Sequence, residues 1–223
     1  MQANGFPGFP AAGIKFLQDL TANNNRPWFE QNRALYKKEL EAPAKAFAAA
    51  MERELAQRFG VDFKGKIFRL HRDLRFSKDK TPYNTHLRMA FFPFDAAQDG
   101  QGFYFSLEPE CLILGGGAMG FSKSGLETFR QAVVDDAQGH SVEAMLVGLV
   151  EGGFRLEAPE LKRVPAGFDK AHPREALLRR KSLTLWRDLS DHDGVTNPRA
   201  VAFCAGVFEN LRPLYQFLGA LRS

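Results

Sequence analysis

The sequence has little cysteine and no long apolar run. Only two cysteines, Cys111 and Cys204, occur in 223 residues, and they lie far apart in different expected elements. Two lone thiols favour a reducing compartment over a disulfide framework. No apolar run approaches the length of a membrane span. The first residues, MQANGFPGFPAAG, lack the basic and apolar regions of a secretion signal. We therefore expect a soluble, cytoplasmic protein with no membrane partner.

The patterns of familiar catalytic sites are also missing. The five histidines are scattered and show no His-x-x-x-His spacing. His71, Asp73 and His86 would converge if their strands paired, but this set alone does not predict a metal. Ser77 and Thr81 have no identifiable base, so nucleophilic catalysis is unsupported. The sequence therefore predicts no metal, no cofactor and no identifiable catalytic residue.

The chain is rich in phenylalanine and concentrates its positive charge in one segment. The 21 phenylalanines supply a large apolar core. Residues 66–88 read KIFRLHRDLRFSKDKTPYNTHLR and hold seven Lys or Arg residues against two Asp residues, a net charge of +5. The whole chain carries only +4, so the remainder is slightly negative. Such a cluster marks either an anion-binding site or a dense ion-pair network.

The hydrophobic periodicity predicts helices at both ends of the chain and strands in the middle. Helices are expected around 14–20, 27–36, 43–59, 124–133, 141–151 and 197–218, with Ser124 and Glu127 as a capping box and Pro213 as a kink. Strands are expected at 67–76, 85–91, 103–107, 111–114 and 183–187. The predicted core includes Phe68, Leu70, Phe105, Leu107, Phe129 and Phe208.

This order of elements predicts an α+β fold. We expect a mostly antiparallel central sheet with N-terminal and C-terminal helices packed on it. No internal repeat or long linker occurs, so residues 1–223 are expected to form a single domain. The run Gly115-Gly116-Gly117 is not followed by Gly-Lys-Ser/Thr, so it is interpreted as a bulge or tight exit from the sheet, not a phosphate loop.

The basic segment is the candidate site. If residues 67–76 are extended, alternate residues up to Phe76 form an apolar face. The opposite face then presents Arg69, His71, Asp73 and Arg75. Arginine forks and lysine point charges suit phosphate or carboxylate groups. We expect the cations of this segment and His86 to share one neighbourhood. The candidate ligand-binding residues are Arg26, Trp28, Arg69, His71, Arg72, Asp73, Arg75, Ser77, Lys78, Lys80, Tyr83 and His86.

Three functions are compatible with this segment. The first is a pocket for a small anionic ligand, with or without catalysis. The second is a nucleic-acid-binding module with Trp28 and Tyr83 as stacking platforms, although the basic residues occupy one short stretch and not an extended groove. The third is a non-catalytic scaffold or interaction protein, in which Asp73 and Asp79 tie the arginines into a structural network.

Four segments resemble a family of conserved hypothetical proteins, domain of unknown function 2461. The most specific is the run from Arg72 to Tyr83 with Thr85-His86. The same family pattern also fits three other segments: Asn24-Asn25-Arg26 with Trp28-Phe29, the triple glycine, and Pro165-x-Gly167-Phe168 with His172-Pro173. The resemblance extends from Phe16-Leu17 to Phe217-Leu218. Asn84 departs from it, because the family prefers Lys there. The resemblance implies a single soluble domain and no particular substrate.

Overall fold

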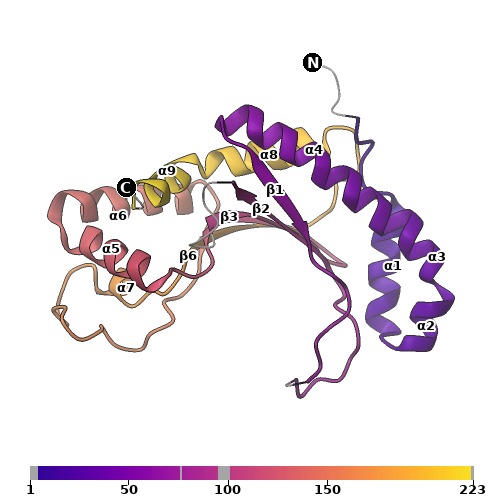
Figure 1. The fold of residues 1–223 in the computed structure, drawn as a ribbon, viewed down its shortest axis with the longest axis horizontal. Coiled ribbons are helices and arrows are strands. Elements are labelled where there is room, and N and C mark those ends of the chain that lie inside the picture. The colour runs from indigo at the N-terminus through magenta and orange to yellow at the C-terminus, as the bar shows by residue number, and fades with distance from the viewer. Residues whose placement is uncertain (1–4, 76, 95–100, 222–223) are drawn as a thin grey trace. The chain divides into compact units, whose positions relative to one another are not determined.

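A computed structural model describes residues 5–75, 77–94 and 101–221 of the chain (Figure 1). Six strands form one antiparallel sheet in the order β1-β2-β3-β4-β6-β5. The strands are β1 (Phe63–Ile67), β2 (Leu87–Pro93), β3 (Gln101–Leu107), β4 (Leu112–Ala118), β5 (Arg155–Leu156) and β6 (Leu183–Leu189). With the helices described below, this sheet confirms the α+β class predicted from the sequence.

The chain divides into two compact units. Unit 1 comprises residues 1–91, 104–114 and 188–207, and unit 2 comprises residues 92–103, 115–187 and 208–223. Strands β2, β3, β4 and β6 each contribute residues to both units. The single domain expected from the sequence stays a prediction. Within the described residues, no helix is long and apolar enough to cross a bilayer.

Helices fill the first part of unit 1, as the sequence predicts. They are α1 (Ala11–Ala22), α2 (Arg26–Gln31), α3 (Arg33–Tyr36), a short π-helix (Lys37–Glu41) and α4 (Ala42–Phe59). The Asn25 side chain accepts a hydrogen bond from the backbone N–H of Trp28 at 3.0 Å and so begins α2. Gly60 adopts φ 74°, a left-handed conformation that ends α4. Helix α4 packs against β1, where the Glu52 carboxylate accepts from Gly65 N at 2.6 Å.

Phenylalanine rings build the core of unit 1. Phe6, Phe9, Phe47 and Phe105 contact one another with ring centroids 5.0–5.7 Å apart. Offset and edge-on ring pairs of this kind add stability beyond the area that they bury. Five of the six predicted core positions are buried, which confirms them: Leu70, Phe105, Leu107, Phe129 and Phe208.

The sixth predicted core residue, Phe68, is 42% exposed, so that prediction is wrong. The reason is that β1 ends at Ile67 and the predicted strand over 67–76 does not form. Asp73 accepts from Arg75 N at 3.2 Å, and Asp79 accepts from Thr81 N at 2.9 Å. Side-chain bonds of this kind offer the backbone an alternative to a strand ladder. Phe76 lies outside the described residues.

Helices α5 (Lys123–Val134), α6 (Asp136–Glu151) and α7 (Glu175–Leu178) belong to unit 2. The predicted capping box at Ser124 and Glu127 is wrong, because Ser122 caps α5 by accepting from Gly125 N at 3.0 Å. Helix α6 begins five residues earlier than predicted, since Asp135 caps it by accepting from Gln138 N at 2.8 Å. The last predicted helix is divided at Leu211 into α8 (Ala200–Asn210) and α9 (Arg212–Ala220).

The triple glycine lies inside β4 and not at an exit from the sheet, which corrects its interpretation. A Cβ atom at Gly115 would lie 2.4 Å from the Trp186 ring. One at Gly117, where φ is +126°, would lie 2.0 Å from the Leu183 carbonyl oxygen. Strand β6 therefore approaches β4 more closely than any residue with a side chain would allow.

Phe208→Ala should lower the free energy of unfolding by about 3–5 kcal/mol, because it removes a fully buried ring. Phe203→Ala on the same helix is the matched control, since Phe203 is 36% exposed and should cost clearly less. Urea unfolding of both variants measures the difference. Equal losses would contradict the assigned burial.

Candidate functional site

Residues 68–86, here called the arm, leave the sheet after β1 and return to it at β2 (Figure 1). Backbone hydrogen bonds hold its two legs together near the sheet. Phe68 N donates to Arg88 O at 2.9 Å, and Asn84 N donates to Leu70 O at 2.7 Å. Farther along, Arg72 N donates to Pro82 O at 2.9 Å. The arm contains ten of the twelve residues that the sequence proposes as ligand-binding.

The α1–α2 connection fixes the base of the arm. The Asn24 side chain donates to Tyr83 O at 2.9 Å and accepts from Tyr83 N at 3.1 Å. The Phe29 ring stacks on the Tyr83 ring at 4.1 Å, and His71 packs edge-on against Tyr83 at 4.8 Å. Burial raises the pKa of Tyr83. The structure thus brings His71 and Tyr83 together, in contacts that anchor the arm.

Arg72 is the centre of a hydrogen-bond network in the arm. Its side chain is only 23% exposed, and Nη1 pairs with the Asp79 carboxylate. The same guanidinium donates to Thr81 O at 3.2 Å and to Ser77 Oγ at 3.2 Å. Hydrogen bonds from the Thr81 backbone and from Arg72 lower the pKa of Asp79 to about 2. Arg72 and Ser77, both candidate ligand residues, therefore hold the arm in shape.

The second acid of the arm is also engaged. The Asp73 carboxylate pairs with Arg75 Nη2 at 2.6 Å, on an exposed part of the chain. The hydrogen bonds from Arg75 lower the pKa of Asp73. Asp79 is thus bonded to Arg72 and Asp73 to Arg75. These two pairs are what the third hypothesis, a structural network of arginines and acids, expects for Arg72 and Arg75.

Three cations of the arm remain: Arg69, Lys78 and Lys80. All three residues are exposed. Within the part of the chain that the structure describes, no carboxylate lies within the 4.0 Å ion-pair distance of any of them. Lys80 Nζ donates to the Leu74 carbonyl at 3.1 Å, which leaves its charge uncompensated. Their common neighbourhood with Arg75 and His86 stays a prediction.

His86 has a partner that sequence reasoning missed. Its Nδ1 lies 3.5 Å from the Glu108 carboxylate, which follows β3. Glu108 also accepts from Ser106 Oγ at 2.6 Å and lies 3.7 Å from Arg88 Nη2. The hydrogen bond from His86, opposed by burial, lowers the pKa of Glu108 to about 2. A lone Glu next to Pro109 in a turn carries no sequence pattern that would reveal this pairing.

The two candidates outside the arm lie on α2. The Trp28 ring contacts the Phe16 ring at 5.4 Å, which is a packing role. Arg26 is exposed, and its positive charge acts on the Tyr83 hydroxyl.

Among described residues, no group of three His, Cys, Asp or Glu side chains could hold a metal. Burial raises the pKa of the Cys111 and Cys204 thiols, which makes both poor nucleophiles.

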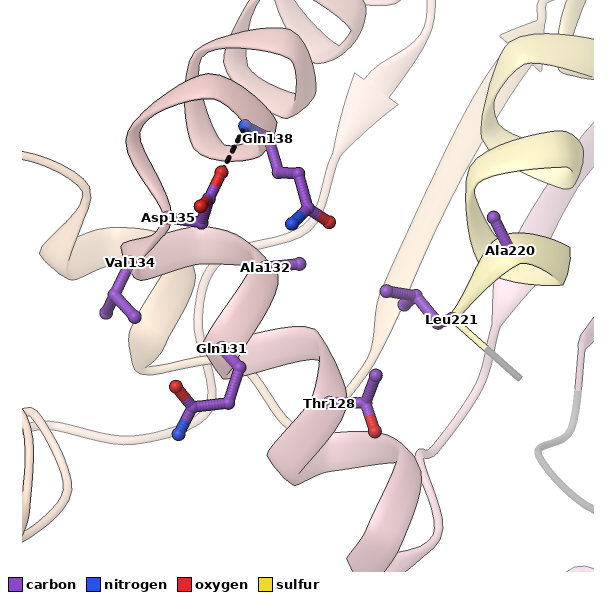
Figure 2. A pocket seen from close by; sticks show the side chains of 8 residues that line it. All are labelled: Thr128, Gln131, Ala132, Val134, Asp135, Gln138, Ala220 and Leu221. Carbon is purple, nitrogen blue, oxygen red and sulfur yellow. Dashed lines mark hydrogen bonds between the residues drawn. The ribbon is translucent and has the colours of Figure 1, made fainter. Parts of the chain in front are cut away.

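A cleft of about 500 Å³ lies in unit 2 (Figure 2). Helix α5, the beginning of α6 and the end of α9 line it through Thr128, Gln131, Ala132, Val134, Asp135, Gln138, Ala220 and Leu221. No predicted site residue belongs to it. Its one acid, Asp135, is the N-cap of α6 and is bonded to the Gln138 backbone N–H. The cleft lacks the cationic groups that the anion-binding hypothesis requires.

Residues 12–217 match a family described as conserved hypothetical protein, DUF2461. The chain therefore belongs to this family, which confirms the resemblance seen in the sequence. A comparison with curated proteins finds no match.

Asn24→Ala should release the base of the arm, because Tyr83 is 3% exposed and would lose both backbone partners. The arm should lose about 1–3 kcal/mol of local stability, since buried backbone groups left unpaired are costly. Amide hydrogen exchange at Tyr83 measures this loss. Asn23→Ala, which removes a bond only to Asp19 O at 2.9 Å, is the control and should leave Tyr83 protected. Equal protection in both variants would disprove the anchoring role.

Glu108→Gln should weaken the loss of stability in acid. The folded-state pKa of Glu108, about 2, lies below the ordinary value near 4.3. Its contribution, on the order of 2 kcal/mol, is therefore present above about pH 4.3 and lost as the pH falls toward 2. Unfolding free energies measured from pH 5 to pH 2 should fall less steeply in the variant than in the wild type. Parallel pH profiles would count against the His86–Glu108 pairing.

Proposed function

We propose that the chain binds a small anionic ligand through the arm, and that Arg69, Lys78 and Lys80 hold its phosphate or carboxylate groups. One observation carries the proposal. Both arm acids are bonded to other arginines, Asp73 to Arg75 and Asp79 to Arg72. The three remaining cations are exposed and have no carboxylate within ion-pair distance among described residues. Exposed cations that no acid bonds attract anions.

The network around Arg72 supports this proposal by keeping the arm in shape. The positions of Lys78 and Lys80 depend on the backbone between Ser77 and Thr81, and Arg72 is bonded to both of those residues. Binding groups held by bonded neighbours lose less conformational freedom when a ligand arrives. The proposal concerns binding and includes no chemical step.

Nucleic acid is a second candidate, favoured by the exposure of these cations on a segment that leaves the sheet (Figure 1). A phosphate backbone provides regularly spaced anions for such a surface. The two ligands are distinguished by salt. Binding to a nucleic acid should weaken steeply as salt rises, and the slope of log K against log salt should fall by about 1 for each arm cation removed.

The double variant Arg69→Ala/Lys78→Ala should lose most anion binding and keep its stability, because both side chains are exposed and neither is bonded to an acid among residues 5–75, 77–94 and 101–221. Isothermal titration with a phosphate monoester and anisotropy with a labelled oligonucleotide measure the two ligand classes. We expect at least about a tenfold loss of affinity for whichever class binds, equivalent to 1.4 kcal/mol.

Arg72→Ala is the contrasting variant. It leaves Asp79 without its arginine and breaks the bonds to Ser77 and Thr81, so it should lower stability. The proposal fails if the wild type binds neither probe. It also fails if the double variant binds as well as the wild type.

A further inference from the structure

In unit 2, a long loop is bonded to the residues that precede β6. Residues 157–174 connect β5 to α7 with no helix or strand. Loops of this length without secondary structure are commonly functional or mobile. This loop contains the Pro165-x-Gly167-Phe168 and His172-Pro173 segments, which the proposed role of the arm does not explain.

The loop is attached to residues 179–182 by a carboxylate. Glu160 accepts a hydrogen bond from Lys181 N at 2.8 Å and another from Ser182 Oγ. Leu161 N donates to Arg179 O at 3.0 Å. Burial raises the pKa of Glu160, but these hydrogen bonds outweigh burial and lower it, so the group is a carboxylate at neutral pH. A backbone N–H and a hydroxyl that converge on one carboxylate form an oxyanion-binding arrangement.

Arg180 directly precedes Lys181 and has no hydrogen-bonded partner for Nε or Nη1 among the described residues. It is 4% exposed, and its Nε and Nη1 atoms are buried without a hydrogen bond among the described residues. The charges of Glu160 and Glu157 act on it, yet neither carboxylate lies within 4.0 Å. Glu157 pairs instead with Arg155 at 2.5 Å. A buried guanidinium without an acceptor is costly.

The other buried arginine of unit 2 shows what a purely structural arginine looks like. Arg174 is 2% exposed on its side chain, as buried as Arg180. It donates from Nε to Val133 O at 2.7 Å and from Nη2 to Asp136 Oδ1 at 3.1 Å. The described residues therefore supply acceptors to Nε and Nη2 of Arg174 but none to Nε and Nη1 of Arg180.

We propose that Arg180, Lys181 and Ser182 form a binding site for the phosphate or carboxylate group of a ligand, and that Glu160 occupies this site in the free chain. The incoming group replaces the Glu160 carboxylate on Lys181 N and Ser182 Oγ. Displacement of Glu160 also removes one of the two acids whose charge acts on Arg180. A phosphate group has a third free oxygen, which a carboxylate lacks, and this oxygen supplies the acceptor for the guanidinium.

Glu160 is then an internal competitor. It is exposed, so a ligand can reach the position that its carboxylate holds. The apparent affinity of the site for the ligand is its intrinsic affinity multiplied by the fraction of molecules in which Glu160 does not occupy the site. All residues of the proposed site belong to unit 2, whereas the arm residues belong to unit 1.

The test is titration of the full chain with inorganic phosphate, at constant ionic strength maintained with chloride. Glu160→Ala should bind phosphate about tenfold more tightly than the wild type if Glu160 occupies the site nine-tenths of the time. Adding Arg180→Met should abolish that gain. Glu160→Gln, which keeps an acceptor and loses the charge, should be intermediate and serves if Glu160→Ala does not fold. Acetate in place of phosphate distinguishes a carboxylate site from a phosphate site.

Two controls locate the effect. Asp169→Ala removes an acid of the same loop that bonds Ala171 N and is not among the acids whose charge acts on Arg180, so phosphate affinity should stay at the wild-type level. Arg69→Ala/Lys78→Ala in the Glu160→Ala background should keep the gain, which separates this site from the arm. The inference is overturned if Glu160→Ala binds neither phosphate nor acetate more tightly than the wild type. It is also overturned if Arg180→Met leaves the gain intact.

Discussion

The side-chain amide of Asn24 bonds both backbone groups of Tyr83, and the position of the arm depends on this contact. Tyr83 is buried, so its N–H and C=O need partners that water does not supply. The sheet does not provide them, because β1 ends at Ile67 and β2 begins at Leu87. Asn24 in the α1–α2 connection provides them, and the Phe29 ring of α2 covers the Tyr83 ring. The helical N-terminal region therefore orients the charged segment that follows it.

Charge pairing determines which cations of the chain are structural and which are open to a ligand. Arg72 is partly buried and Arg174 fully buried, and each has acquired several acceptors. Arg69, Lys78 and Lys80 keep their hydration and need no carboxylate. Arg180 belongs to neither group, since it is buried and its Nε and Nη1 have no acceptor among the described residues. The two proposals rest on these two exceptions to pairing, one solvated in unit 1 and one buried in unit 2.

Local patterns predicted the elements well and their ends less well. The four-residue spacing from Phe47 to Phe59 predicted α4, and Gly60 predicted its end. Both predictions are confirmed because helix periodicity and a left-handed cap depend only on neighbouring residues. The strand over 67–76 failed although its alternation is strict. Asp73 and Asp79 bond nearby backbone N–H groups there, and such bonds compete with a ladder in a way that alternation does not reveal. The cap of α5 is Ser122 and not the predicted Ser124, because Ser122 Oγ accepts from Gly125 N.

The sequence by itself determined the α+β class, the helical ends, most of the aromatic core and the location of the excess positive charge, because periodicity, apolar content and net charge are sums over neighbouring residues. Only the tertiary structure decided the partner of each charge. Glu108 pairs with His86 across 22 positions, Asn24 reaches Tyr83 across 59, and Glu160 bonds Ser182 across 22. A hydrogen bond depends on distances of about 3 Å between atoms that chain order leaves unspecified, so pairing over such separations becomes definite only when the chain is folded.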